Sequence, residues 1–179
     1  LSKKMIESLI DAGAFDEFGL TRNTIKHNLD VIRDYGSLKN SLNIDEKPIL
    51  TIYQDSMMDK LNKEKEVLGI YLSSHPIELI KDKVTTPYVN ISALYDYADR
   101  QVNVIMQLQR VKNITDRKGN EMCFIEGFDE SGSVEGVVFA SCFKSVGVAL
   151  KKGNICLIHG KVDLKDKLSL IVNNARMIE

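Results

Sequence analysis

The spacing of apolar residues changes near residue 100, from a helical period to the alternation of β-strands. Before that point, apolar side chains recur every three or four positions within 3–12, after Thr21 and between Asp59 and Leu72, which predicts helices there. From Gln101 onwards, apolar and polar residues alternate, as they do in strands with one buried face. The pattern predicts an α+β chain, with a helical segment over residues 1–99 and a strand-rich domain over residues 100–179.

The helical part divides at residues that start or stop helices. The first helix is expected to end at Gly13, because glycine readily takes the left-handed conformation that follows a helix C-terminus. Thr21 is a suitable N-cap for a second helix that ends near Gly36. Residues 37–53 are rich in Asn, Ser and Asp, which is typical of a surface linker. The third helix is expected to stop at residues 73–76.

The strand-rich part predicts three strands, a helix and two more strands. The first strand is long, and its alternation slips before Val111, which indicates a bulge. The next two strands form a hairpin around 129–132, and a helix over 140–150 separates them from strands over 155–162 and 168–172. This is the strand order of a five-stranded OB-fold β-barrel, in which the helix between strands three and four closes one end.

Composition and charge narrow the class of protein. Hydrophobic residues make up 44% of the chain and charged residues 27%, as in soluble globular proteins. No apolar run could span a bilayer and no signal peptide opens the chain, so we expect a cytoplasmic protein without membrane contact. The chain starts in a helical pattern without Met, which suggests a fragment. Residues 100–179 hold 12 Lys and Arg against 9 Asp and Glu, whereas residues 1–99 hold 12 against 16, so a polyanion would prefer the second half.

The expected barrel offers a binding surface for nucleic acid. OB-folds bind oligonucleotides through the face of strands two and three and through two flanking loops. Phe124 could stack on a base while cations in those loops hold phosphates, although it could instead belong to the barrel core. The candidates for contact with single-stranded DNA are Phe124, the loop residues Arg117, Lys118, Lys165 and Lys167, and the strand residues Arg110, Lys112 and Lys161.

Catalysis finds little support in the sequence. The aspartates of the second half fall in separate turns, where Asp is common, and do not form the converging set that metal-dependent phosphoryl transfer needs. There is no phosphate-binding glycine loop and no paired His and Cys. The cysteines Cys123, Cys142 and Cys156 lack the spacing of a zinc site and are expected to be free thiols. We therefore expect a binding module that needs no cofactor.

One segment carries a family resemblance. Residues 64–76 read E-K-E-V-L-G-I-Y-L-S-S-H-P and resemble very closely the E-x-E-x-L-G-x-Y-L-S-x-H-P signature of the bacterial DNA polymerase III alpha subunit. Residues 9–16, L-I-D-A-G-A-F-D, resemble a second segment of that family. The resemblance implies a non-catalytic, carboxy-terminal piece that follows a helix-hairpin-helix region. The Mg²⁺-dependent polymerase centre of the parent would lie upstream of this chain.

The resemblance also implies partners. In this family a sliding-clamp motif, a Gln followed after two residues by two apolar side chains, precedes the signature, and Gln54, Met57 and Met58 match it. Met58 replaces the usual aromatic and Asp55 a small or apolar residue, and both methionines could simply pack on the following helix. We expect binding to the single-stranded DNA template and to the clamp. The alternatives are a docking module for other replisome subunits and an anticodon-binding domain, whose pattern residues 124–132 share.

Overall fold

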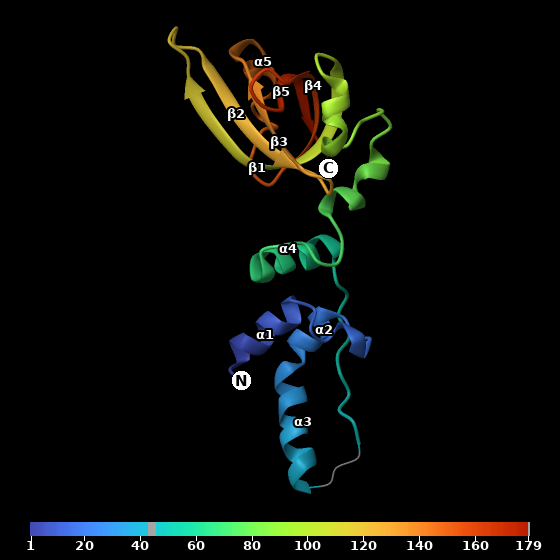
Figure 1. Ribbon diagram of the computed structural model, residues 1–179. Helices are drawn as coiled ribbons and strands as arrows, with labels where there is room; N and C mark the ends of the chain where they lie inside the picture. Colours follow the sequence, from blue (N-terminus) through green and yellow to red (C-terminus); the bar gives the residue numbers. More distant parts are fainter. Residues whose placement is uncertain (43–45, 179) are drawn as a thin grey trace. The chain divides into compact units, whose positions relative to one another are not determined.

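The computed structural model describes residues 1–42 and 46–178 and divides them into two compact units, drawn in Figure 1. The helical unit spans Leu1–Ser74 and the barrel unit spans His75–Glu179. The boundary expected between residues 99 and 100 lies just before the first barrel strand, which begins at Gln101, whereas the compact units divide between Ser74 and His75 because residues 75–100 pack with the barrel. None of the helices in the described part of the chain is long and apolar enough to cross a membrane.

The helical unit is built on a small buried cluster of Ile10, Ile25 and Leu29. Its helices are α1 (Lys3–Asp11), α2 (Arg22–His27), α3 (Leu29–Leu42) and α4 (Met57–Leu68). Thr21 is the N-cap of α2, as predicted, since its hydroxyl accepts a hydrogen bond from the Thr24 N–H at 3.1 Å. Gly13 follows α1 with a positive φ of 86°, which confirms the predicted end of that helix.

Two sequence-based helix boundaries are wrong. The helix expected from Thr21 to Gly36 is interrupted at Asn28, whose side-chain Nδ2 donates to the carbonyl oxygens of Thr24 and Thr51 at 2.8 and 2.7 Å. Helix α3 then continues to Leu42, so the start of the predicted linker is helical, and residues 43–45 lie outside the described residues. Helix α4 ends at Gly69, in the left-handed conformation with φ 77°, several residues before the predicted stop.

The barrel unit contains the predicted three strands, helix and two strands. The strands are β1 (Gln101–Thr115), β2 (Glu121–Phe128), β3 (Ser133–Val138), β4 (Ile155–Asp163) and β5 (Ser169–Met177), and α5 (Ala140–Val146) lies between β3 and β4 in sequence. They close in the order β1-β2-β3-β5-β4, with β3 and β5 parallel and the other neighbours antiparallel. The predicted bulge in β1 is confirmed between Leu108 and Arg110. The OB-fold prediction is therefore confirmed.

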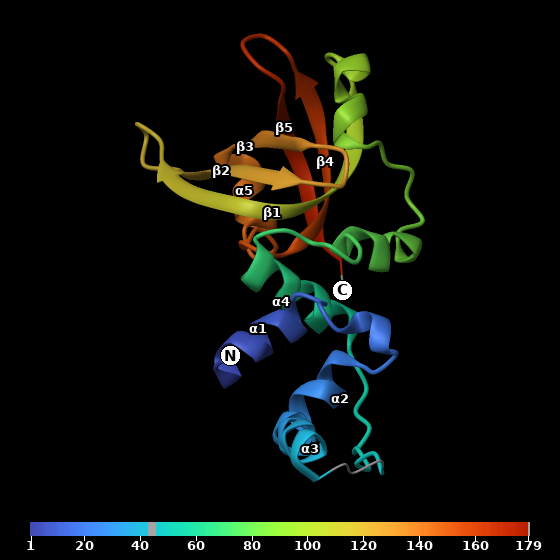
Figure 2. The same cartoon turned by 60° about the horizontal axis from the view of Figure 1, so that its bottom comes forward.

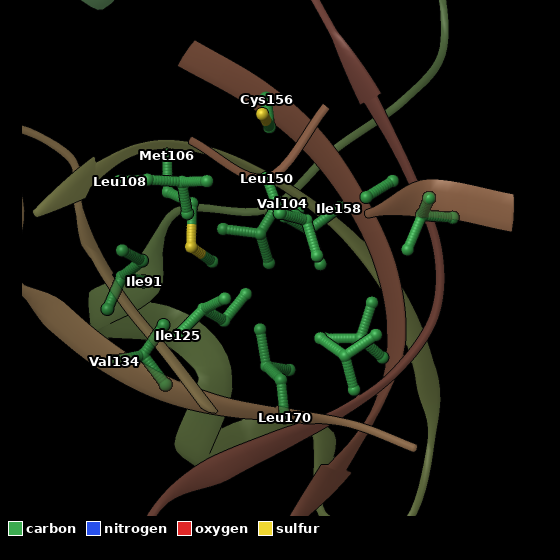
Figure 3. Close-up of a cluster of buried hydrophobic side chains, with 14 of the residues drawn as sticks. Ile91, Val104, Met106, Leu108, Ile125, Val134, Leu150, Cys156, Ile158 and Leu170 are labelled. Atoms are coloured by element: carbon green, nitrogen blue, oxygen red, sulfur yellow. The ribbon is translucent and has the colours of Figure 1, made fainter. Parts of the chain in front are cut away.

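Buried side chains from all five strands fill the barrel, as Figure 3 shows for Val104, Met106, Ile125, Ile158 and Leu170 among others. On the outer side, Ile77 and Ile80 from the short 3-10 helices Pro76–Leu79 and Lys81–Lys83 pack against Ile105, Ile155 and Leu157. This strap is the reason why residues 75–100 belong with the barrel.

Candidate nucleic-acid interface

Phe124 lies on the outside of the barrel. Along β2, Cys123, Ile125 and Gly127 are buried in the interior, and alternation places Phe124 and Glu126 on the opposite face. The ring of Phe124 is 42% exposed. The core interpretation of this residue is therefore excluded, and the side chain lies on the outer surface of β2.

Strand pairing places Phe124 in a row of outward-facing residues that crosses all five strands, with three apolar side chains between two lysines. Lys112 of β1 pairs with Phe124, Phe124 with Val137 of β3, Val137 with Ile171 of β5, and Ile171 with Lys161 of β4. All five side chains alternate outwards from the barrel interior. We call this set the outer stripe. It offers a surface for stacking, with a cation at each end.

The neighbouring row is acidic. Glu126 of β2 pairs directly with Glu135 of β3, and like charges in opposite positions repel each other and any phosphate. Arg110 lies 3.7 Å from Glu126, measured from Nε to Oε2, and Lys167 lies 2.6 Å from Glu135, measured from Nζ to Oε2. Two of the predicted DNA-binding cations are thus engaged with carboxylates. We call Glu126 and Glu135 the acidic row.

The turn between β1 and β2 holds free cations on a rigid frame. The Asp116 carboxylate accepts from the backbone N–H of Lys118 at 2.7 Å and of Asn120 at 2.8 Å, and from Asn120 Nδ2 at 2.9 Å. The Asn120 side chain and these N–H groups lower the pKa of Asp116. Arg117 and Lys118 are exposed and form no ion pair within the described residues. Figure 2 shows this turn and the β4–β5 loop projecting from the barrel.

The predicted cations differ in how available they are. At one end of the outer stripe, Lys161 Nζ lies 2.7 Å from Asp99 Oδ1, and this contact raises the pKa of Lys161 and lowers that of Asp99. Lys112 and Lys165 are exposed and lack an ion pair among the residues that the structure covers. The structure therefore makes Lys112 the direct neighbour of Phe124 and places Lys161 at the other end of the stripe, while the loop cations lie in the β1–β2 turn and the β4–β5 loop.

Sequence reasoning missed the partners of Phe124 across β3. Val137 faces Phe124 across the β2–β3 hairpin, whereas Ile171 joins the stripe through the parallel pairing of β3 with β5, which brings together residues far apart in the chain. Glu135 and its ion pair with Lys167 depend on the same pairing. Alternation within β3 was the available signal, because it places Glu135 and Val137 on the face opposite the buried Val134 and Val138.

The predicted clamp segment lies in the helical unit and is partly ordered by α2. The Asp55 carboxylate accepts from the backbone N–H groups of Arg22 at 2.8 Å and Asn23 at 2.9 Å, so it satisfies the N-terminus of that helix. Gln54 is exposed and extended. Met57 is the first residue of α4 and is 47% exposed, whereas Met58 is half-buried. The unexpected Asp55 thus has a structural role of its own.

Comparisons with known proteins connect both units to one family. DNA polymerase III subunit alpha of Bacillus subtilis (strain 168) is 32% identical over 192 residues, which cover 100% of this chain and 17% of that protein. The corresponding subunit of Staphylococcus aureus (strain MRSA252) is 33% identical over 189 residues, covering 99% and 17%. The chain is homologous to one region of the DNA polymerase III alpha subunit. It spans about a sixth of the length of these relatives.

Two further comparisons concern the barrel unit. Residues 109–178 match the tRNA anti-codon family model, which is described as an OB-fold nucleic acid binding domain. Among solved structures, the hypothetical protein ygiW from E. coli is 14% identical, covers 53% of this chain and 94% of its own, and has a TM-score of 0.40. That likeness is too weak to add to the assignment. The OB-fold domain therefore lies within the region shared with the polymerase subunit.

The polymerase signature has a visible structural role in the helical unit. Glu64, its first residue, is fully buried, and its Oε2 accepts from the backbone N–H groups of Leu72 and Ser73 at 2.8 Å each. Its other oxygen accepts from the Ser73 hydroxyl and lies 2.9 Å from Arg22 Nη2. Burial acts to raise the pKa of Glu64, but the hydrogen bonds from Ser73, Leu72 and Arg22 outweigh it and lower the pKa. The Glu and Ser of the signature therefore belong to one hydrogen-bond network, which runs from the buried Glu64 to the exposed Ser73.

Proposed function

We propose that the barrel unit binds single-stranded DNA across the outer stripe, as a non-catalytic part of a replicative DNA polymerase alpha subunit. The observation that carries the proposal is the exposed ring of Phe124, set between Lys112 and Val137 on the barrel of a nucleic-acid-binding family. Catalysis and the Mg²⁺ it would require are assigned to the remainder of the parent protein. In this proposal the present region holds template and leaves the chemistry to other domains.

The distribution of charge favours one path for the strand. Bases would stack on Phe124 and contact Val137, while Lys112 and the turn cations Arg117 and Lys118 would neutralise phosphates. Because Arg110 and Lys167 already contact the carboxylates of the acidic row, the backbone is expected to run past Lys112 and the turn cations, on the side of Phe124 away from Glu126. Few phosphates would then be contacted, so affinity should be modest and should fall steeply as salt rises.

The test is fluorescence anisotropy of labelled oligo-dT with the complete chain at two salt concentrations. Replacing Phe124 by Ala should cost about 1–3 kcal/mol for a stacked base, which is roughly 5- to 150-fold in Kd. Charge reversal at Arg117 and Lys118 should weaken binding and flatten the salt dependence. The matched control is Tyr95→Ala, which removes a 65% exposed ring outside the strands. If Phe124→Ala and Tyr95→Ala behaved alike, the assigned surface would be wrong.

A second candidate function follows from the same face. Its centre is apolar and its neighbouring row is acidic, a combination that also suits docking of another replisome subunit. In that case oligo-dT would not bind measurably, and Phe124→Ala would instead reduce capture of a purified replisome subunit. Tighter binding of RNA than of DNA would instead favour the anticodon-binding alternative. The anisotropy measurement with both polymers separates these outcomes.

We further propose that the segment around Gln54, Met57 and Met58 docks on the sliding clamp. Its support is the exposure of Gln54 and Met57 at the point where an extended segment becomes α4. The test is a pull-down with purified clamp, comparing the wild-type chain with Gln54→Ala/Met57→Ala/Met58→Ala. A Val148→Ala variant, which changes an 84% exposed apolar residue of the barrel unit, serves as the control. Equal retention of all three proteins would reject this motif.

A further inference from the structure

A polar cavity lies on the barrel where β1, β4 and β5 run side by side, apart from Phe124 and its neighbours in β2 and β3. Its volume is about 240 Å³, and it is lined by Thr86, Asn103, Leu157, His159, Asn174 and Arg176. Strand pairing explains the arrangement, because His159 pairs with Asn103 on one side and Asn174 on the other, while Leu157 pairs with Arg176. Side chains from three strands thus surround a floor that includes Leu157. We call this the β4 cavity.

A bulge in β5 shapes one wall of the β4 cavity. The register shifts between His159 and Gly160, so that β5 carries one extra residue, Asn173, before Asn174. Asn173 Nδ2 donates to Gln101 Oε1 at 2.9 Å, and Asn174 Oδ1 accepts from the Ala175 backbone N–H at 2.9 Å. Because this hydrogen bond occupies Oδ1, the NH₂ group of Asn174 can donate a hydrogen bond to a ligand.

On the opposite wall of the cavity, hydrogen bonds determine which polar atoms are donors and which are acceptors. Asn103 Nδ2 donates to the Pro87 carbonyl oxygen at 2.9 Å, so its Oδ1 is the acceptor facing His159 Nδ1 at 2.9 Å. His159 Nδ1 therefore donates a hydrogen bond to Asn103. This pairing holds the imidazole in place at the cavity wall. Within residues 1–42 and 46–178, Arg176 forms no ion pair.

The chemistry of the lining points to a tetrahedral oxyanion. The β4 cavity is lined by a guanidinium, an imidazole, carboxamides and a hydroxyl, and by no carboxylate. The donors that remain open to a ligand are the guanidinium of Arg176, the NH₂ group of Asn174 and the hydroxyl of Thr86. Such a set suits a ligand with several acceptor oxygens, and a guanidinium pairs well with phosphate. The volume lies below the range of about 300–1,000 Å³ that drug-sized ligands need. A single phosphate group fits this description better than a whole nucleotide.

We propose that the β4 cavity binds a phosphate group, either a free or terminal phosphate or the phosphodiester of a strand. The proposal goes beyond binding at the outer stripe and does not depend on Phe124. If oligo-dT failed to bind the chain, inorganic phosphate could still be tested at the cavity, so the two proposals can fail separately.

The test uses NMR on the complete chain at constant ionic strength. Inorganic phosphate should shift the side-chain amide signals of Asn103 and Asn174 and the Nε–H signal of Arg176 in a saturable way. Arg176→Gln removes an exposed charge and should weaken the phosphate response about tenfold or more. Asn174→Asp, which adds a carboxylate without changing shape, should abolish it. Lys152→Gln, an exposed cation outside the cavity, is the matched control and should respond as wild type.

Dinucleotides then identify the source of the phosphate. A stronger response to thymidine dinucleotide with a 5′-phosphate than without it assigns the cavity to a terminal phosphate, and equal responses assign it to the phosphodiester. Either result supports the proposal. An absence of saturable shifts, an equal response to acetate, or the same response in Arg176→Gln as in Lys152→Gln would overturn it.

Discussion

Replacing Glu64 by Gln tests whether the buried network of the signature stabilises the helical unit. The substitution preserves shape but removes the charge and leaves one carbonyl oxygen where the carboxylate had two. That oxygen cannot serve both Arg22 and the N–H groups of Leu72 and Ser73. Arg22 keeps Asp16, whose oxygens lie 2.9 and 2.7 Å from its Nε and Nη2, so the guanidinium is not left without a partner.

The expected cost follows from these contacts. Removing one partner of a buried ion pair costs about 3–5 kcal/mol. Because Arg22 keeps its contact with Asp16, we expect Glu64→Gln to cost an amount at the lower end of this range. A loss of about 3 kcal/mol is a large fraction of the 5–15 kcal/mol that stabilises an ordinary domain. Because a chain of two units need not unfold in one step, the measurement should resolve each unit. Hydrogen exchange should show Leu72 and Ser73 amides losing roughly a hundredfold in protection.

The control lies two residues further along the same helix. Glu66 has a 68% exposed side chain and forms a surface ion pair with Lys63, so Glu66→Gln should change stability by less than about 0.5 kcal/mol. Equal loss of protection in the two variants would refute the assigned role of Glu64. So would a loss confined to the barrel unit.

The same network predicts a pH dependence with a defined sign. The pKa of Glu64 is lower in the folded chain than its ordinary value, so its contribution to stability is present above that value and is lost as pH falls through the folded pKa. The wild-type helical unit should therefore be more stable than Glu64→Gln at about pH 7, and the difference should narrow towards about pH 3. Arg22 also lowers the pKa of Asp16, chiefly through hydrogen bonding, so part of the acid sensitivity should remain in the variant.

Four further predictions concern barrel packing, helix propensity, capping and thiol reactivity. Gly160→Ala should destabilise the barrel unit by about 1–3 kcal/mol in thermal unfolding, because its Cβ would lie 2.6 Å from a backbone carbonyl oxygen of β5. Gly36→Ala, within α3 and with open space around its Cβ, should instead stabilise the helical unit by about 0.5–1 kcal/mol. Asp55→Ala should cost about 0.5–2 kcal/mol, because two N–H groups at the start of α2 lose their acceptor. Iodoacetamide should modify Cys142 before Cys156, since Cys142 is half-exposed and burial raises the pKa of Cys156 to about 12.

Each of these predictions has an outcome that contradicts it. A barrel that tolerates Ala at residue 160 would mean that β5 can shift at its bulge without loss. Unchanged exchange of the first α2 amides in Asp55→Ala would show that water replaces the carboxylate. Mass spectrometry of the alkylated peptides decides the order of thiol modification, and equal rates would indicate that the barrel opens faster than the reagent reacts.

The sequence predicts most of the barrel because its signals are local. Alternation, turn residues and the slip before Val111 each depend on a few neighbouring positions, and the structure places strands, turns and bulge accordingly. Alternation also places Phe124 on one face of β2, although it does not say whether that face is the interior. That choice depends on which residues fill the closed barrel, and the interior is filled by Cys123 and Ile125.

The features that the sequence does not predict depend on distant residues. Asn28 ends α2 because its side chain bonds to Thr51, which lies 23 positions along the chain. Glu135 of the acidic row forms its ion pair with Lys167 only because the parallel pairing of β3 with β5 brings the two residues together. The β4 cavity combines residues between Thr86 and Arg176. Local periodicity carries no information about such pairings, so the loop cations could be named but their ion pairs could not.

The parallel pairing of β3 with β5 makes the barrel depend on β5, the last of its five strands in sequence. Until Ser169–Met177 leaves the ribosome, β3 and β4 each present an unpaired edge, and edges of this kind recruit strands from other molecules. A stop codon or a protease cut before residue 169 would therefore convert a closed domain into an aggregation-prone sheet. The nascent protein needs protection during this interval, and a shortened one would need it permanently.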